Sequence, residues 1–153
     1  MREKFLSVLK YLPIVLLIIH CVVIFNFSAQ SATESTETST KTVEQVLDVI
    51  NGDKEVTKEE VKKAEPVARS IAHFMLFLVL GVLTALVLRN VEDFPRLFAV
   101  LSFCVLYAFV DEFHQTFSPG RSFEFEDILV DFAGSACGFL IYFAVQKIWR
   151  KIR

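Results

Sequence analysis

The amino-acid sequence predicts an all-α integral membrane protein, a four-helix bundle with a short extracytoplasmic amphipathic helical cap. The chain has 153 residues, of which 54% are hydrophobic. These hydrophobic residues form four blocks instead of alternating with polar ones, at about residues 11–27, 70–88, 96–113 and 128–146. Because about 20 apolar helical residues cross the hydrocarbon core of a bilayer, each block predicts a transmembrane helix. Residues 1–153 are expected to form a single membrane domain.

The distribution of basic residues predicts which helix ends face the cytoplasm. Arg2 and Lys4 precede the first block, Arg89 and Arg96 follow the second, and bases cluster at residues 147–153. Cytoplasmic loops are enriched in Lys and Arg, so both termini are expected to be cytoplasmic in a multi-pass protein of the cell membrane. The acidic segments after blocks one and three are then expected outside. A cleaved signal peptide is the alternative for block one, whose apolar run is longer than a usual signal core.

Residues 28–68 form a hydrophilic insert between the first two blocks. Its first part, SAQSATESTETSTKT, is rich in Ser and Thr and is expected to be a loop. Apolar residues then recur at helical spacing, at Val43, Val46, Leu47 and Ile50. A second short helix is expected from Thr57, an N-cap that forms a capping box with Glu60, as far as Pro66. The two segments are expected to form an amphipathic cap on the membrane surface, with a partly disordered loop as the alternative.

Polar and ionisable residues gather at the predicted outer ends of the helices. Such side chains cost about 2.5–3.5 kcal/mol each at the centre of a membrane helix, and they persist where they pair or have a function. Because successive spans alternate in direction, residues far apart in the chain are expected to meet in one shallow pocket. These residues are Gln30, Arg69, His73, Asp111, Glu112, His114, Gln115, Arg121, Asp127 and Asp131.

The residue types in this cluster fit three kinds of chemistry. General acid–base catalysis is expected of the carboxylates and one imidazole, namely Asp111, Glu112, His114, Asp127 and Asp131. Binding of an anionic substrate is expected of the arginines and their polar neighbours, namely Arg69, His73, Gln115, Arg121 and Gln30. A divalent metal ion is a further candidate cofactor, with Asp111, His114 and Asp131 as its ligands, although no metal signature of fixed spacing is present. The alternative is an ion-pair and hydrogen-bond network that only holds helix ends together.

Two features of the apolar blocks favour structural roles. Gly134 and Gly138 form a GxxxG pair, which is expected to serve close packing inside the bundle, with a homodimer seam as the alternative. His20 lies in the middle of the first block and is expected to donate a hydrogen bond between helices. Lys and Arg residues are scattered or flank the blocks instead of forming a basic patch, which argues against nucleic acid as a partner.

The segment DEFHQTFSPGRSFEFEDILVDFAGSACG, Asp111–Gly138, resembles the signature of the VanZ-like family. This family is named for a protein associated with resistance to the glycopeptide antibiotic teicoplanin. FSAQ (Phe27–Gln30) and RSIAHF (Arg69–Phe74) are similar to further family segments. The resemblance covers nearly the whole chain except residues 31–68, and it implies a single VanZ-like membrane domain with its polar positions on the ten residues above. Leu76 departs from the pattern, because the family often has an acidic residue there.

The resemblance and the polar cluster together imply a role in the cell envelope. The leading hypothesis is a protein that acts on or binds a lipid-linked surface component at the outer membrane face and thereby contributes to glycopeptide resistance. Its partners would be membrane lipids or a lipid-linked envelope precursor. Enzymatic activity stays open, since a non-enzymatic protein that shields or binds the antibiotic would use the same pocket. An ion-coupled transporter is the third alternative, disfavoured because the inner half of the bundle has almost no charged residues.

Overall fold

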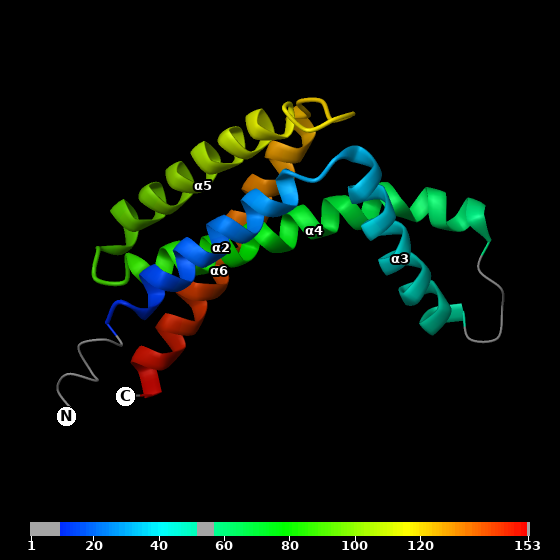
Figure 1. Cartoon of the computed structure of the whole chain (residues 1–153). Coiled ribbons are helices and arrows are strands. Elements are labelled where there is room, and N and C mark those ends of the chain that lie inside the picture. The colour runs from blue at the N-terminus through cyan, green and yellow to red at the C-terminus, as the bar shows by residue number, and fades with distance from the viewer. Residues whose placement is uncertain (1–9, 52–56, 153) are drawn as a thin grey trace, which may run out of the picture.

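The computed structural model describes residues 10–51 and 57–152, which form helices joined by short turns (Figure 1). The helices are α2 (Leu12–Ser28), α3 (Ala32–Asn51), α4 (Lys58–Val87), α5 (Asp93–Gln115) and α6 (Phe125–Ile152). The described residues contain no strand, and the predicted all-α fold is confirmed. The N-terminal bases Arg2 and Lys4 and the side chain of Ile50 lie outside the described part of the chain.

Three helices, α4, α5 and α6, are long and apolar enough to cross a membrane. Helix α2 has 17 residues, which is about 26 Å of helix and slightly less than the hydrocarbon thickness. It reaches the length of a span only together with the first part of α3, from which it is bent by 106°. The chain therefore has the helices of a multi-pass membrane protein, with three spans, or four when α2 and α3 are counted as one bent span.

The four apolar helices lie side by side, and α2 and α5 run opposite to α4 and α6 (Figure 1). The closest approach is between α4 and α6. A Cβ atom added to Gly134 or Gly138 of α6 would collide with the backbone carbonyl of Phe74 or Leu78 of α4. Both glycines are buried, so the predicted close-packing face is occupied by α4 within one chain.

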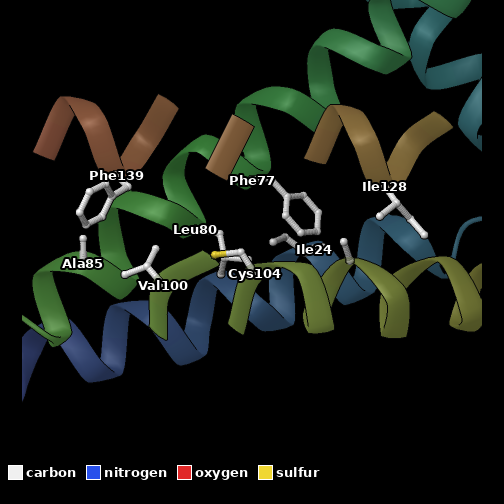
Figure 2. Close-up of a cluster of buried hydrophobic side chains, with 9 residues drawn as sticks. Ile24, Phe77, Leu80, Ala85, Val100, Cys104, Ile128 and Phe139 are labelled. Carbon is white, nitrogen blue, oxygen red and sulfur yellow. The ribbon is translucent and has the colours of Figure 1, made fainter. Parts of the chain in front are cut away.

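A hydrophobic core fills the space between the helices (Figure 2). Each apolar helix contributes to it, for example through Ile24 of α2, Phe77 of α4, Cys104 of α5 and Phe139 of α6, all at most 4% exposed. Large apolar side chains also cover the outer surface of the bundle, as Phe98, Leu106 and Leu140 do. In a bilayer this surface faces lipid, where exposed apolar side chains carry no hydrophobic penalty.

The Ser- and Thr-rich part of the insert is helical, so the prediction of a loop is wrong from residue 32 onward. Helix α3 begins with a capping box formed by Ser31 and Glu34. Ser31 Oγ accepts the backbone N–H of Glu34 at 3.3 Å, and Glu34 Oε2 accepts the backbone N–H of Ser31 at 2.9 Å. Thr38 and Thr42 donate to carbonyls four residues earlier, which satisfies their hydroxyl groups within the helix. These local bonds offset the low helix propensity of Ser and Thr.

Helix α4 begins at the predicted capping box but does not end at Pro66. Thr57 Oγ1 accepts the backbone N–H of Glu60, and Glu60 Oε2 accepts the backbone N–H of Thr57 at 2.9 Å, as predicted. The helix then continues for 30 residues through Pro66 to Val87, so the expected short cap helix and the second span are one element. Pro66 and Lys62 are both exposed, so the carbonyl that proline leaves without a donor is accessible to water.

A buried arginine holds the opposite end of the bundle together. Arg96 of α5 is 0% exposed. It donates to the carbonyl oxygen of Arg89 at 3.3 Å, to the Asp93 carboxylate and to Gln146 Oε1 of α6 at 2.9 Å. Its guanidinium lies 5.4 Å from the centre of the Tyr142 ring. The turn between α4 and α5 is thereby tied to α6, so this residue has a structural role in addition to its charge.

Candidate functional site

The predicted polar residues lie where α2 and α5 end and α6 begins, beside the middle of α4 (Figure 1). Within this region, His73 and Asp131 join α4 to α6, with His73 Nδ1 3.2 Å from Asp131 Oδ1. Asp131 is 0% exposed, and its second oxygen, Oδ2, is buried without a hydrogen-bond partner in the described part of the chain. Buried carboxylate oxygens are normally satisfied, so Oδ2 is an acceptor available to a donor or a cation.

Gln115 connects the acids of α5 to an arginine. Its Nε2 donates to Asp111 Oδ2 at 3.2 Å and to Glu112 Oε1 at 2.9 Å. Its Oε1 accepts from Arg121 Nη1 at 2.9 Å. The second oxygen of Glu112 accepts the backbone N–H of Glu124 at 2.9 Å. The amide therefore turns its donor side to the carboxylates and its acceptor side to the guanidinium, which fixes all three charged groups.

The turn between α5 and α6 carries Arg121 to the site. Gly120 has a φ of 76°, a conformation that favours glycine. The carbonyl oxygen of Pro119 accepts the backbone N–H of Ala32 at 3.0 Å, which docks the turn on the start of α3. Arg121 Nη2 donates to Ser35 Oγ of α3 at 3.2 Å. The guanidinium thus joins the end of α5, at Gln115, to the start of α3, at Ser35.

A cavity of about 430 Å³ lies between α2, α3 and α4 and reaches this cluster. Its polar lining includes Gln30, Arg69, His73, Asp111 and Arg121. Its apolar lining includes Ile24, Met75, Leu76, Phe77 and Val79. Burial, and next the positive charge of Arg69, lower the pKa of the Arg121 guanidinium. The nearby carboxylates of Glu112, Asp127 and Asp111 act in the opposite direction on this pKa.

Two overlapping sets of side chains bring potential metal-ligand atoms within 4.8 Å of one another. One set contains His73, Asp111 and Asp131, and the other contains His73, Glu112 and Asp127. His73 belongs to both sets. The sequence-based ligand set had His114 in this position, and neither set contains it.

His114 takes a different direction from its neighbours on α5. Its ring stacks on Phe25 of α2 with 3.9 Å between ring centres. Its Nδ1 is buried without a hydrogen-bond partner among the described residues. The residue is absent from the cavity lining, whereas Asp111 is part of it. Of the ten predicted residues, His114 is therefore the one that the structure separates from the ligand groups, the cavity and the Gln115 network.

Sequence reasoning missed one wall of the cavity. Side chains of α3 that carry hydroxyl groups line it, at Ser35, Thr38, Ser39 and Thr42. Their spacing of three and four residues puts them on one face of a helix. The Ser31–Glu34 capping box was the signal that could have predicted this helix and hence this wall.

The sequence profile of a family described as VanZ/LLP1 matches residues 13–148. The chain belongs to the VanZ/LLP1 family. The matched range includes all of α3, α4 and α5, nearly all of α2, most of α6 and every candidate site residue from Gln30 to Asp131. A search of the curated proteins and of the solved structures found no match. The membrane helices and the polar cluster described above are thus those of a VanZ/LLP1 protein.

Proposed function

We propose that this VanZ/LLP1 protein binds or acts on a lipid-linked envelope component with an anionic group at the outer face of the cell membrane. The proposal includes a contribution to resistance against glycopeptides such as teicoplanin. The observation that carries it is a single cavity with two arginines at one end and apolar walls at the other. A ligand that matches both ends is amphipathic, with a charged headgroup and a hydrocarbon chain.

The cavity is long enough to take part of such a chain. On α4 its lining extends from Ala68 to Val79 and on α2 from Ser28 to His20, which corresponds to about 16 Å and 12 Å along the helices. This is roughly half of the hydrocarbon thickness. His20 Nε2 donates to the carbonyl oxygen of Leu76 at 2.8 Å, so its ring is engaged in holding α2 to α4, as its sequence position predicts.

The part of the bundle between the cavity and Arg96 favours a closed pocket over a transport path. The buried hydroxyls there, Thr84 and Ser135, donate to carbonyls of their own helices, at Leu80 and Asp131. The thiol of Cys104, which belongs to the apolar core shown in Figure 2, contacts both hydroxyls. Hydroxyls bound in this way do not connect the polar cluster to Arg96 at the other end. This argues for headgroup binding or chemistry instead of ion-coupled transport.

Binding of labelled lipids tests the proposal directly. Purified protein in nanodiscs would be incubated with radiolabelled envelope lipids, using wild type, Arg69→Gln and Arg121→Gln. The matched control is Arg89→Gln, because Arg89 lies after the opposite end of α4. Both site variants are expected to bind at least tenfold more weakly, since hydrogen bonds to charged groups are each worth about 1.5–3 kcal/mol. Equal binding by all four proteins would contradict the proposal.

Analysis of the retained lipid separates catalysis from binding. A chemically converted lipid that forms with wild type and is lost with Asp111→Asn would assign acid–base catalysis to the cluster. Unchanged lipid would assign a binding or shielding role to the same cavity. In cells, Arg121→Gln is expected to abolish any decrease in teicoplanin susceptibility that the wild type confers, whereas Arg89→Gln is expected to preserve it.

The proposed orientation has an independent test. After replacement of the three native cysteines, Thr36→Cys on the exposed side of α3 is expected to react with a membrane-impermeant maleimide in intact cells. Lys151→Cys near the end of α6 is expected to react only after the membrane is opened. The reverse pattern would place the cavity on the cytoplasmic side and contradict an envelope ligand.

A further inference from the structure

Three residues from three helices form a compact set of nitrogen and oxygen donors beside the cavity. They are His73 of α4, Asp111 of α5 and Asp131 of α6, and their ligand atoms lie within 4.8 Å of one another. His73 Nδ1 and Asp131 Oδ1 are 3.2 Å apart. Two ligands of a tetrahedral ion, each at about 2.0–2.1 Å, are roughly 3.3 Å apart. The closest pair therefore already has the spacing of metal ligands, and the third ligand atom, from Asp111, lies within 4.8 Å of both.

The unsatisfied oxygen of Asp131 is a second and independent observation. Asp131 is fully buried, and its Oδ2 has no hydrogen-bond partner in the described part of the chain. The nearby hydroxyl of Ser135 donates to the backbone carbonyl of Asp131 and not to its carboxylate. A buried charged oxygen without a partner is costly, and a bound cation removes that cost.

The balance of charge around His73 also favours a cation. Glu112 and Asp127 form the second ligand set with the same histidine, so four carboxylates surround one imidazole. The cavity beside them contains two arginines, Arg69 and Arg121. A divalent ion among these carboxylates would offset the repulsion between them.

We propose that the protein binds one divalent transition-metal ion, Zn²⁺ or Mn²⁺, through His73, Asp111 and Asp131. An imidazole with carboxylates suits these ions, whereas Mg²⁺ and Ca²⁺ prefer oxygen ligands alone. His73 and Asp111 also line the cavity, so the ion would be accessible to an anionic group bound there. This last consequence rests on the proposed function, but the metal site itself does not.

Metal binding by the purified protein is the test. Protein without a polyhistidine tag would be stripped with a chelator and titrated with Mn²⁺, with bound ion measured by equilibrium dialysis and elemental analysis. Mn²⁺ is the preferred probe because the free thiols of Cys21, Cys104 and Cys137 would favour Zn²⁺. Wild type is expected to bind one Mn²⁺ per chain. His73→Gln and Asp131→Asn are expected to bind it at least tenfold more weakly.

The other histidines provide matched controls. His20→Gln and His114→Gln remove imidazoles that lie outside both ligand sets, and both are expected to bind Mn²⁺ as the wild type does. Nitrogen couplings in the electron paramagnetic resonance spectrum of Mn²⁺ bound to the wild type give a second readout. This readout needs no variant, so it does not depend on whether a variant folds. Wild type that binds less than a tenth of an ion per chain of both Mn²⁺ and Zn²⁺, a Mn²⁺ spectrum without nitrogen couplings, or full binding by His73→Gln would overturn the proposal. Lipid binding without Mn²⁺ binding would overturn the metal site and leave the proposed function in place.

Discussion

His73 Nδ1 and Asp131 Oδ1 lie 3.2 Å apart, and the helix contact next to them makes this distance possible. Gly134, three residues after Asp131, packs directly against the carbonyl oxygen of Phe74, the residue after His73. Because glycine has no side chain, the two backbones come close enough for a histidine and a short aspartate to meet. The glycine seam and the candidate site are therefore parts of one arrangement of α4 and α6.

Gly138→Ala and Gly134→Ala are expected to destabilise the protein by about 1–3 kcal/mol each, because the added methyl group meets a backbone carbonyl that has no rotamer to change. Unfolding in detergent, followed by circular dichroism, measures the change. Ala144→Leu adds more volume to α6 at an exposed position and is the control, expected within about 0.5 kcal/mol of wild type. If Gly138→Ala left the stability unchanged, α4 and α6 would have to be farther apart than in this structure.

Gln115→Leu is expected to cost about 1.5–3 kcal/mol, because it removes hydrogen bonds to Asp111, Glu112 and Arg121 at a position only 2% exposed. The same change is expected to weaken lipid binding, since Arg121 loses the contact that orients it. Thr116→Val, the exposed neighbour, should alter neither property. Thermal unfolding and the labelled-lipid assay check the two effects. Unchanged stability would mean that the amide network is not formed.

The sequence predicted the helices and the meeting of the polar residues because both follow from strong signals. Apolar blocks of span length mark membrane helices, and alternating helix directions then bring the ends of α2, α5 and α6 together. The rotation of side chains around a helix was harder to predict. Successive residues differ by roughly 100°, so Gln115 can point to the acids while His114 points to Phe25. Which of two adjacent residues enters a site depends on helix packing, which the spacing within α5 alone does not determine.

In the insert, residues 28–68, different local signals in the sequence favoured different structures. The low helix propensity of Ser and Thr favoured a loop, while the Ser31–Glu34 capping box favoured a helix, and the helix is what forms. Pro66 similarly favoured a helix end. Exposure of Pro66 and packing between α3 and α4, where Val43 and Val61 are buried, instead allow the helix to continue. A local capping box therefore accounts for α3, whereas exposure and packing account for the continuation of α4 through Pro66.

Arg96→Lys is expected to lower stability by about 1–3 kcal/mol, because one ammonium group cannot replace a planar guanidinium that bonds Arg89, Asp93 and Gln146 at once. Lipid and Mn²⁺ binding are expected to be unchanged in the folded fraction, since this network lies at the end of the bundle opposite the cavity. Arg150→Lys, at an exposed position of α6, is the control. Loss of ligand affinity in Arg96→Lys beyond the loss of folded protein would show that the two ends are coupled.

His114→Phe separates a packing role of this histidine from a chemical one. The substitution preserves an aromatic ring against Phe25, whose centre lies 3.9 Å from that of His114, and it removes both ring nitrogens. Because His114 lies outside the cavity lining and both ligand sets, His114→Phe is expected to retain stability, lipid binding and Mn²⁺ binding within about twofold. His114→Ala, which also removes the ring, is expected to lose about 0.5–1.5 kcal/mol or more of stability through the lost stack. If His114→Phe instead abolishes the formation of a lipid product that wild type makes, the sequence-based assignment of His114 as a catalytic residue is correct, and the ring must reach the cavity in a state with ligand bound.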